Sequence, residues 1–119
     1  MDKELMKGSI DILLLSQIKG KDMYGFEIIK SLEKKSRNVY TMSEGTLYPA
    51  LQRLEQKKLL KSYWGDSDTG GRRKYYTITE NGTKELNQKL TDWKKVNDLI
   101  DSCKEGLEWA DLKNISIQF

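Results

Sequence analysis

The chain has 119 residues, one cysteine and no histidine, so it can form one ordinary core but lacks the histidine-based catalytic triads and zinc sites. No acidic pair lies in a recognisable pocket motif either, and we expect neither an enzyme nor a bound metal or cofactor. No apolar run approaches the roughly 20 residues of a membrane span, and the charged start and lone cysteine are typical of a cytoplasmic protein.

The net charge of +3 is distributed unevenly along the chain. Residues 1–79 hold 15 Lys and Arg against 10 Asp and Glu, whereas residues 80–119 hold 6 against 8. The first two-thirds is therefore the part suited to a polyanion such as DNA, although many solvated surfaces carry an excess of this size.

The first half of the chain predicts three short helices. The first covers about 5–18 and is apolar on two faces, which indicates that it packs on a second body as well as on the core. After Gly20, Asp22 is a suitable N-cap for a second helix, which ends in the polar stretch 34–38. The third begins near Ser43 or Thr46. The sequence leaves this choice open, and a start at Ser43 requires a distortion near Pro49.

The second half predicts a hairpin and a long helix. Strands at 60–64 and 72–78 flank a loop of turn formers at 65–71. The last helix opens at 79–82 and carries apolar residues every three or four positions along about 36 Å, towards a stop at Gly106. The predicted fold is mainly α with a small β-hairpin: a winged helix-turn-helix at 1–79, a dimerisation helix at 80–106 and a tail of unknown role at 107–119.

Two segments carry a DNA-binding hypothesis. The third helix has small polar groups near its N-terminal end, as a helix needs to approach base edges and phosphates, although an ordinary solvated face fits the same stretch. The hairpin tip joins two glycines to three successive cations, which suit a phosphate backbone or a minor groove, or alternatively keep a hairpin soluble. Alternation along the strand should place Arg72 and Lys74 on one side and Arg73 on the other. The predicted DNA contacts are Ser43, Thr46, Tyr48, Gln52, Arg53, Arg72, Arg73 and Lys74.

The last helix carries an apolar seam formed by Leu86, Leu90, Trp93, Val96, Ile100 and Cys103. Three short helices and one wing cannot cover so long an arm, so we expect a second copy to bury the seam in a two-fold dimer that matches a palindromic operator. Near the two-fold axis, Trp93 would meet its symmetry mate, either in plain hydrophobic packing or as two walls of a pocket for an aromatic ligand.

Three segments together resemble the PadR family of transcriptional regulators. They are Met23-Tyr24-Gly25-Phe26-Glu27-Ile28, the stretch 44–55 with its Gly-Thr-Leu-Tyr-Pro core, and 71–79 with Gly-Arg-Arg-Lys-Tyr-Tyr. The resemblance implies a dimer that represses a neighbouring gene. The runs 62–66 and 93–100 look closest to the LmrR-like multidrug-responsive branch, in which flat aromatic drugs stack between two tryptophans in a pore between subunits.

This branch implies a ligand site at the dimer interface. Its residues would be Leu5, Gly8, Asp11, Ile12 and Leu15 of the first helix and Lys89, Asp92, Trp93 and Asn97 of the last. Neutral Asn97 stands where an acidic residue is expected and Lys89 adds positive charge, which argues against a preference for cationic drugs unless Asp92 or Asp11 substitutes.

We therefore predict a dimeric repressor whose partners are a palindromic double-stranded operator, a second copy of the chain and a planar hydrophobic effector. We expect no association with a membrane. The alternative is a drug-binding or protein-interaction dimer without specific DNA binding. A carboxylate hydrolase built on Asp92 or Asp11 is a third reading, for which we expect no turnover. The apolar tail receives no function.

Overall fold

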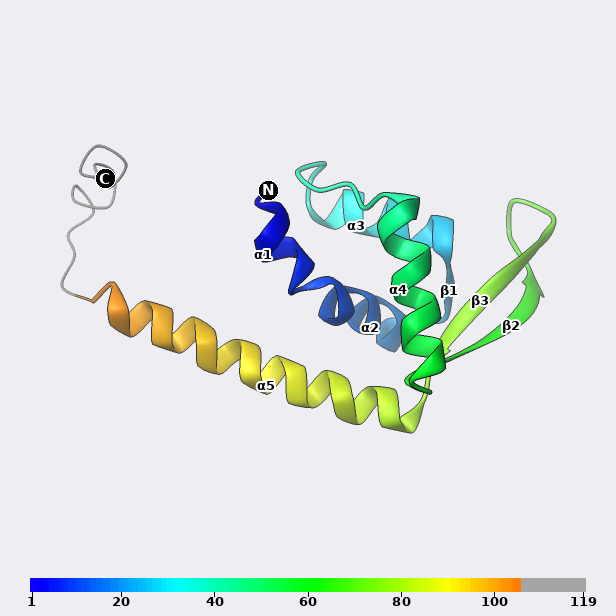
Figure 1. Cartoon of the computed structure of the whole chain (residues 1–119). Coiled ribbons are helices and arrows are strands. Elements are labelled where there is room, and N and C mark those ends of the chain that lie inside the picture. Colours follow the sequence, from blue (N-terminus) through cyan, green and yellow to red (C-terminus); the bar gives the residue numbers. More distant parts are fainter. Residues whose placement is uncertain (106–119) are drawn as a thin grey trace. The chain divides into compact units, whose positions relative to one another are not determined.

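The computed structural model describes residues 1–105, so the predicted tail and the predicted helix stop at Gly106 lie outside the described residues. In chain order the elements are α1 (Lys3–Lys7), α2 (Ile10–Gly20), β1 (Met23–Tyr24), α3 (Gly25–Lys35), α4 (Glu44–Gln56), β2 (Leu60–Asp66), β3 (Arg72–Ile78) and α5 (Glu80–Cys103) (Figure 1). The chain divides into a unit of residues 1–89, called the head below, and a second unit from Leu90 onward. Helices dominate and the one sheet is small, which confirms the predicted fold class.

The predicted first helix is in fact two helices, so the single helix over 5–18 is wrong. Asp2 caps α1 by accepting a hydrogen bond from the Glu4 N–H at 2.8 Å. The chain then tightens at Gly8, where the Ser9 N–H donates to the Met6 carbonyl at 2.9 Å. Because the spacing of apolar residues continues across this turn, periodicity alone does not reveal the break.

The second predicted helix begins at Gly25, and Asp22 is not its N-cap. Tyr24 takes that position, and its N–H donates to the Glu27 carboxylate at 3.2 Å. Met23 and Tyr24 form β1, a third strand that the sequence prediction lacks. Asp22 instead accepts a hydrogen bond from the hydroxyl of Tyr63 on β2 at 2.6 Å.

The third helix begins directly after Ser43, which settles the choice that the sequence leaves open. The Ser43 Oγ accepts a hydrogen bond from the Thr46 N–H at 3.2 Å. The helix is continuous from Glu44 to Gln56, so Pro49 does not interrupt it. Its effect is local, since Pro49 has no N–H to donate to the Gly45 carbonyl.

The sheet is antiparallel in the order β1-β3-β2, and β2 with β3 forms the hairpin called the wing below. The observed β3 agrees with the predicted 72–78, whereas β2 is two residues longer than the predicted 60–64. Asp66 pairs with Arg72 at the tip, and a turn over 67–71 closes the hairpin. Gly70 and Gly71 have φ of 90° and 82°, a left-handed backbone that favours glycine.

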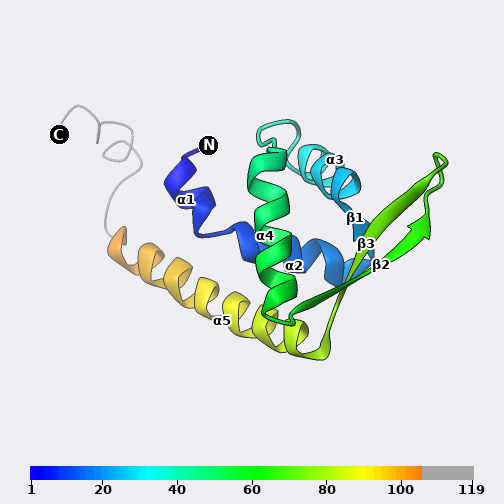
Figure 2. The same cartoon turned by 45° about the vertical axis from the view of Figure 1, so that its right-hand side comes forward.

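The core of the head lies between α2, α3, α4 and the base of the wing. In both views α4 crosses α2, while the wing projects beyond the helices (Figures 1 and 2). The buried hydrophobic residues are Ile10, Leu14, Leu15, Ile18, Ile28, Ile29, Leu32, Met42, Leu47, Ala50, Leu51, Leu54, Leu60, Tyr76 and Leu86. None of the helices among residues 1–105 has the length and apolar content to cross a membrane.

Two residues predicted for interfaces belong to this core. Leu15, predicted for the ligand site, is fully buried, and Leu86, predicted for the dimer seam, is 4% exposed. Both side chains pack inside their own chain, so neither lies on a surface that a ligand or a second copy can reach. The prediction is corrected at these two positions.

Candidate nucleic-acid interface

The exposed face of α4 is built by its core stripe. Leu47, Leu51 and Leu54 are fully buried, which leaves the other side of the helix to solvent. On or beside that side lie the five residues predicted from this helix to contact DNA, all of them exposed: Ser43, Thr46, Tyr48, Gln52 and Arg53. The Ser43 hydroxyl also contacts the Thr46 hydroxyl at 3.1 Å, so the two polar groups stand together at the start of the helix.

Tyr48 lies against the start of α3. A Cβ atom built on Gly25 would be only 2.4 Å from the Tyr48 hydroxyl oxygen and 2.8 Å from its ring. Glycine at this position therefore makes room for the tyrosine. The contact fixes where the ring of Tyr48 stands on the exposed side of α4.

A hollow of about 450 Å³ lies between the exposed side of α4 and the wing. It is called the α4–wing hollow below. Its lining residues are Tyr48, Gln52, Glu55 and Gln56 from α4 and Lys74 and Tyr76 from β3. Three residues of the predicted DNA-binding set thus meet at one depression, two on its helix wall and one on its wing wall.

The wing presents its three cations on two faces, as the strand alternation predicts. On one face the Arg72 guanidinium lies 5.9 Å from the centre of the Trp64 ring, and the Lys74 ammonium lies 5.6 Å from that of Tyr76. On the other face the Arg73 guanidinium lies 5.7 Å from the centre of the Tyr24 ring. Aromatic rings therefore support each cation at the distances of cation–π contacts.

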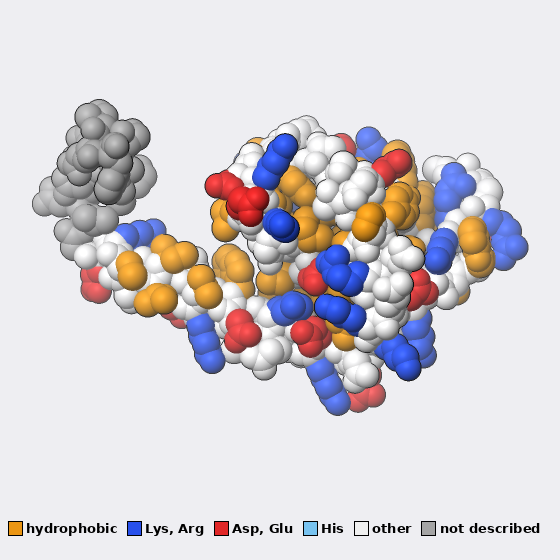
Figure 3. Space-filling model, viewed as in Figure 1, with side chains coloured by type: hydrophobic (Ala, Val, Ile, Leu, Met, Phe, Trp, Pro, Cys, Tyr) orange, Lys and Arg blue, Asp and Glu red, His pale blue; other side chains and the backbone are white. Residues whose placement is uncertain are grey.

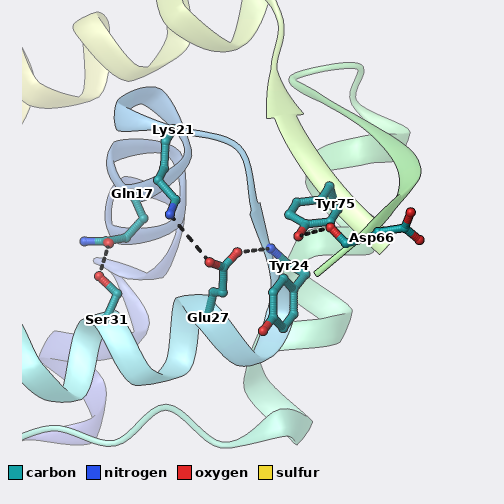
Figure 4. Close-up of polar contacts among 7 residues, drawn as sticks. All are labelled: Gln17, Lys21, Tyr24, Glu27, Ser31, Asp66 and Tyr75. Carbon is teal, nitrogen blue, oxygen red and sulfur yellow. Dashed lines mark hydrogen bonds and ion pairs between the residues drawn. The ribbon is translucent and has the colours of Figure 1, made fainter. Parts of the chain in front are cut away.

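The face of Arg73 is stiffened by three tyrosines. The Tyr75 ring stacks on Tyr63 with centroids 5.6 Å apart and meets Tyr24 edge-on at 5.4 Å. The hydrogen bond to Asp22, together with partial burial, raises the pKa of Tyr63 from 10.0 to about 12. The Tyr75 hydroxyl donates to the Asp66 carbonyl at 3.2 Å (Figure 4).

Polar contacts tie this face to the helices (Figure 4). The Glu27 carboxylate that caps the Tyr24 N–H also lies 3.6 Å from the Lys21 ammonium. Deeper in the head, the amide oxygen of Gln17 on α2 accepts a hydrogen bond from the Ser31 hydroxyl on α3 at 2.7 Å. These contacts hold β1, α2 and α3 in a fixed relation under the wing.

The guanidinium of Arg53 pairs with the Asp11 carboxylate of α2. Both side chains remain partly exposed. The sequence prediction assigns Arg53 to DNA and Asp11 to the ligand, and the structure joins the two residues in one ion pair.

The predicted ligand residues fall into two groups. Leu5 and Gly8 are exposed and Ile12 is half-buried in the head, while the Lys89 ammonium lies 3.7 Å from the Glu85 carboxylate. Asp92, Trp93 and Asn97 belong to the second unit, where all three are exposed. A separate hollow of about 480 Å³ lies beside α1 and the start of α4, and its lining includes Met6, Lys7 and Ser43.

The predicted dimerisation seam is exposed from Leu90 onward. The side chains of Leu90, Trp93, Val96 and Ile100 are 42–56% exposed, and Cys103 is also exposed. Hydrophobic side chains are visible along this part of α5 in Figure 3. The sequence prediction missed Leu99, which is even more exposed and lies three residues after Val96, a spacing that could have indicated it.

Two further residues of the wing surface were missed by the sequence prediction. Trp64 is exposed, and its ring contacts the Arg72 guanidinium. It lies opposite Lys74 in the strand register, and this pairing shows that Trp64 is on the same face of the wing as Arg72 and Lys74. Glu55 lines the α4–wing hollow, and its contacts depend on how the helix meets the sheet. Among residues 1–105, no three carboxylate or thiol groups are clustered to hold a metal ion.

The head, in which α4 lies beside the wing, has the winged helix-turn-helix fold of a class of transcriptional regulators. Residues 14–88 match the sequence pattern described as the transcriptional regulator PadR-like family. The chain belongs to this family.

Two bacterial proteins are similar to this chain in sequence. An uncharacterized protein X of Lysinibacillus sphaericus is 39% identical over 105 residues, which are 88% of this chain and 96% of that protein. The transcriptional regulator YqjI of Escherichia coli (strain K12) is 28% identical over 81 residues, which are 68% of this chain but 37% of that protein.

Solved structures give the same result. A transcriptional regulator from Clostridium thermocellum has a TM-score of 0.77 and 36% identity, with 84% of this chain and 97% of that chain covered. A PadR-like transcriptional regulator from Bacillus cereus has a TM-score of 0.78 and 30% identity, with 87% and 99% covered. The family and these structures are of transcriptional regulators rather than enzymes, as expected from the sequence.

Proposed function

We propose that this PadR-family regulator is a dimeric repressor that binds operator DNA through α4 and the wing. The observation that carries the proposal is the α4–wing hollow, in which Tyr48 and Gln52 face Lys74. In a winged helix-turn-helix, the recognition helix enters the major groove and the wing follows the backbone or the adjacent minor groove. One sugar–phosphate strand then runs along such a hollow, with base edges on the helix side.

The cations have separate roles in this proposal. Arg72 and Arg73 stand on opposite faces of the wing tip, so they can hold phosphates on either side of the hairpin. Ser43 and Thr46 at the start of α4 offer hydroxyls, and the N-terminal end of a helix favours a nearby phosphate.

The dimer is supported by the exposed apolar face of α5. A second copy would bury Leu90, Trp93, Val96 and Ile100 and remove them from water. Two-fold symmetry would also present two heads to a palindromic operator, whose half-sites lie about 34 Å apart.

The test is binding of the full chain to duplex DNA from upstream of its own gene, measured over a range of salt concentrations. Arg73→Ala should weaken binding and reduce the slope of log affinity against log salt by about one for each head bound, and so by about two for the dimer. Lys84→Ala is the matched loss of charge, since this exposed lysine lies on α5 and is not among the predicted DNA contacts, and its slope should equal that of the unaltered chain. An unchanged slope for Arg73→Ala contradicts the wing assignment. A chain that is monomeric at micromolar concentration, or that ignores duplex DNA at low ionic strength, contradicts the whole proposal.

We further propose that a planar hydrophobic effector binds at Trp93 in the dimer, as in the LmrR-like branch. The support is the exposure of this indole within the apolar seam, where two copies would bring two such rings together. Effector binding lowers operator affinity if it favours a dimer in which the angle between the two heads no longer matches the two half-sites.

Fluorescence separates this site from the other tryptophans. A flat aromatic dye should quench the unaltered chain, and Trp93→Ala should lose most of the dye-dependent quenching. Trp64→Phe, an alteration of the exposed indole on the wing, should keep it. Equal quenching in Trp93→Ala contradicts the proposal and assigns the dye to Trp64 or Trp109. Dimerisation and dye binding without DNA binding would favour the alternative of a drug-binding dimer.

A further inference from the structure

One carboxylate contacts both strands of the wing from α4. Glu55 Oε2 accepts a short hydrogen bond from the Ser62 hydroxyl on β2. Its other oxygen, Oε1, lies 3.8 Å from the Lys74 ammonium on β3. The side chains of Glu55 and Lys74 are 34% and 44% exposed, so the pair is open to solvent and to a polyanion.

The Lys74 ammonium is confined on a second side as well. It lies 5.6 Å from the centre of the Tyr76 ring, and that ring is buried in the core. Burial, together with the Glu55 charge, raises the pKa of Tyr76. Lys74 is thus placed between a carboxylate and an aromatic ring at the edge of the α4–wing hollow.

The two arginines of the wing differ from Lys74 in this respect. Arg72 and Arg73 contact the rings of Trp64 and Tyr24, which leaves their charge available to an incoming anion. A phosphate that enters the hollow must compete with Glu55 for Lys74 and then lie near a like charge. Both effects oppose the entry of phosphate whatever the base sequence is.

We infer that Glu55 is a positioning residue that withholds the Lys74 charge from the phosphates of arbitrary DNA. This inference rests on the proposed function, in which DNA enters the α4–wing hollow. Sequence-independent affinity comes almost entirely from phosphate neutralisation, so one withheld cation lowers the affinity for competing genomic DNA. Glu55 thereby lowers the part of the affinity that does not depend on base sequence, so base contacts supply a larger share of the total.

The test uses Glu55→Gln and a mixed-sequence duplex of about 30 base pairs, long enough for two half-sites. Glutamine keeps an oxygen that accepts the Ser62 hydrogen bond but removes the charge. Affinity for this duplex should rise about two- to fivefold for each head bound, which is the worth of one partly exposed ion pair. The slope of log affinity against log salt should steepen by about 0.9 for each head bound, the value for one additional phosphate neutralised per head.

The matched control is Glu85→Gln. Glu85 pairs with Lys89 at 3.7 Å on α5, outside the predicted DNA surface, so this variant has the same loss of charge and a similar lost pair. Its affinity and slope should equal those of the unaltered chain. If Glu55→Gln behaves like Glu85→Gln, the inference is overturned.

Dependence on Lys74 distinguishes positioning from a general change in charge. In a Lys74→Gln background, Glu55→Gln should no longer steepen the slope, and a slope that still steepens contradicts the role assigned to Lys74. If Glu55→Gln fails to fold, Lys74→Gln alone tests the inference. It should flatten the slope less than Arg73→Ala does, and equal flattening contradicts the inference. Absence of DNA binding by the unaltered chain would instead refute the proposed function.

Discussion

Replacing Gly82 with alanine should destabilise the head more than any gain in helix propensity can offset. Gly82 lies in the first turn of α5, where an added Cβ would be 2.1 Å from the Leu59 carbonyl oxygen and 2.7 Å from Ile78 Cγ1. The carbonyl cannot move away easily, because it accepts hydrogen bonds from the Thr79 N–H at 3.0 Å and the Thr79 hydroxyl at 3.1 Å. The start of α5 must therefore shift.

The magnitude follows from three contributions. Alanine gains up to about 1 kcal/mol over glycine in a helix. Overpacking costs about 1–3 kcal/mol, with the upper end expected where the contact is a backbone atom. Displacing α5 also withdraws Leu86, whose full burial is worth about 1.5–3 kcal/mol. With about 3 kcal/mol lost to overpacking, about 1 kcal/mol regained from helix propensity and up to about 1 kcal/mol lost by a partial withdrawal of Leu86, the free energy of unfolding should fall by about 2–3 kcal/mol.

The assay is thermal unfolding followed by circular dichroism. For a head of this size the loss corresponds to a fall of about 10–20 °C in Tm. All variants must be compared at one protein concentration, since dimerisation makes Tm depend on it. Gly20→Ala is the matched control, because no atom lies within 4 Å of an added Cβ there, and it should unfold at or slightly above the Tm of the unaltered chain. A Tm for Gly82→Ala equal to that of the unaltered chain would refute the reasoning.

Two further predictions concern the tyrosines. Gly25→Ala should displace the half-exposed Tyr48 ring, so DNA affinity measured by fluorescence anisotropy should fall. The free energy of unfolding measured in urea should change by less than about 1 kcal/mol. An unchanged DNA affinity would contradict this prediction. The Tyr63 hydroxyl has its pKa raised to about 12, chiefly by Asp22, so its stabilisation is present below pH 10 and is lost as the pH rises towards 12. Asp22→Asn should lower the pH midpoint of Tyr63 ionisation. The tyrosinate absorbance of Tyr63 is the part of the titration that is lost in Tyr63→Phe. A midpoint that does not move would count against this hydrogen bond.

The parts of the fold that depend on local chemistry could be predicted from the sequence. The strand at 72–78 is rich in aromatic and β-branched residues and follows two glycines, and the structure confirms its bounds. The long helix of 24 residues follows from an uninterrupted pattern of apolar residues. Alternation along β3 also predicted the two faces of the wing, because the direction of side chains in a strand depends only on the backbone.

The parts that depend on tertiary contacts could not. Strand β1 has two residues and exists because Met23 and Tyr24 pair with β3, which no local pattern indicates. The break at Gly8 interrupts a helix whose apolar spacing continues on both sides. The pairing of Arg53 with Asp11 joins α4 to α2 across 42 residues of sequence, so neither residue reveals the contact by itself.

The seam of α5 shows most clearly where periodicity stops being informative. Leu86 and Leu90 are one turn apart on the same helix, yet the first is 4% exposed and the second 42%. The difference arises at the start of the helix, where Gly82 allows a close approach to Leu59 and the Thr79 hydroxyl donates to the Lys58 carbonyl at 2.8 Å. These contacts hold the first turns of α5 against the head and bring Leu86 into its core. The spacing of apolar residues therefore shows which of them share a face of α5. It does not show which of them are buried in the head, because that depends on tertiary contacts at the start of the helix.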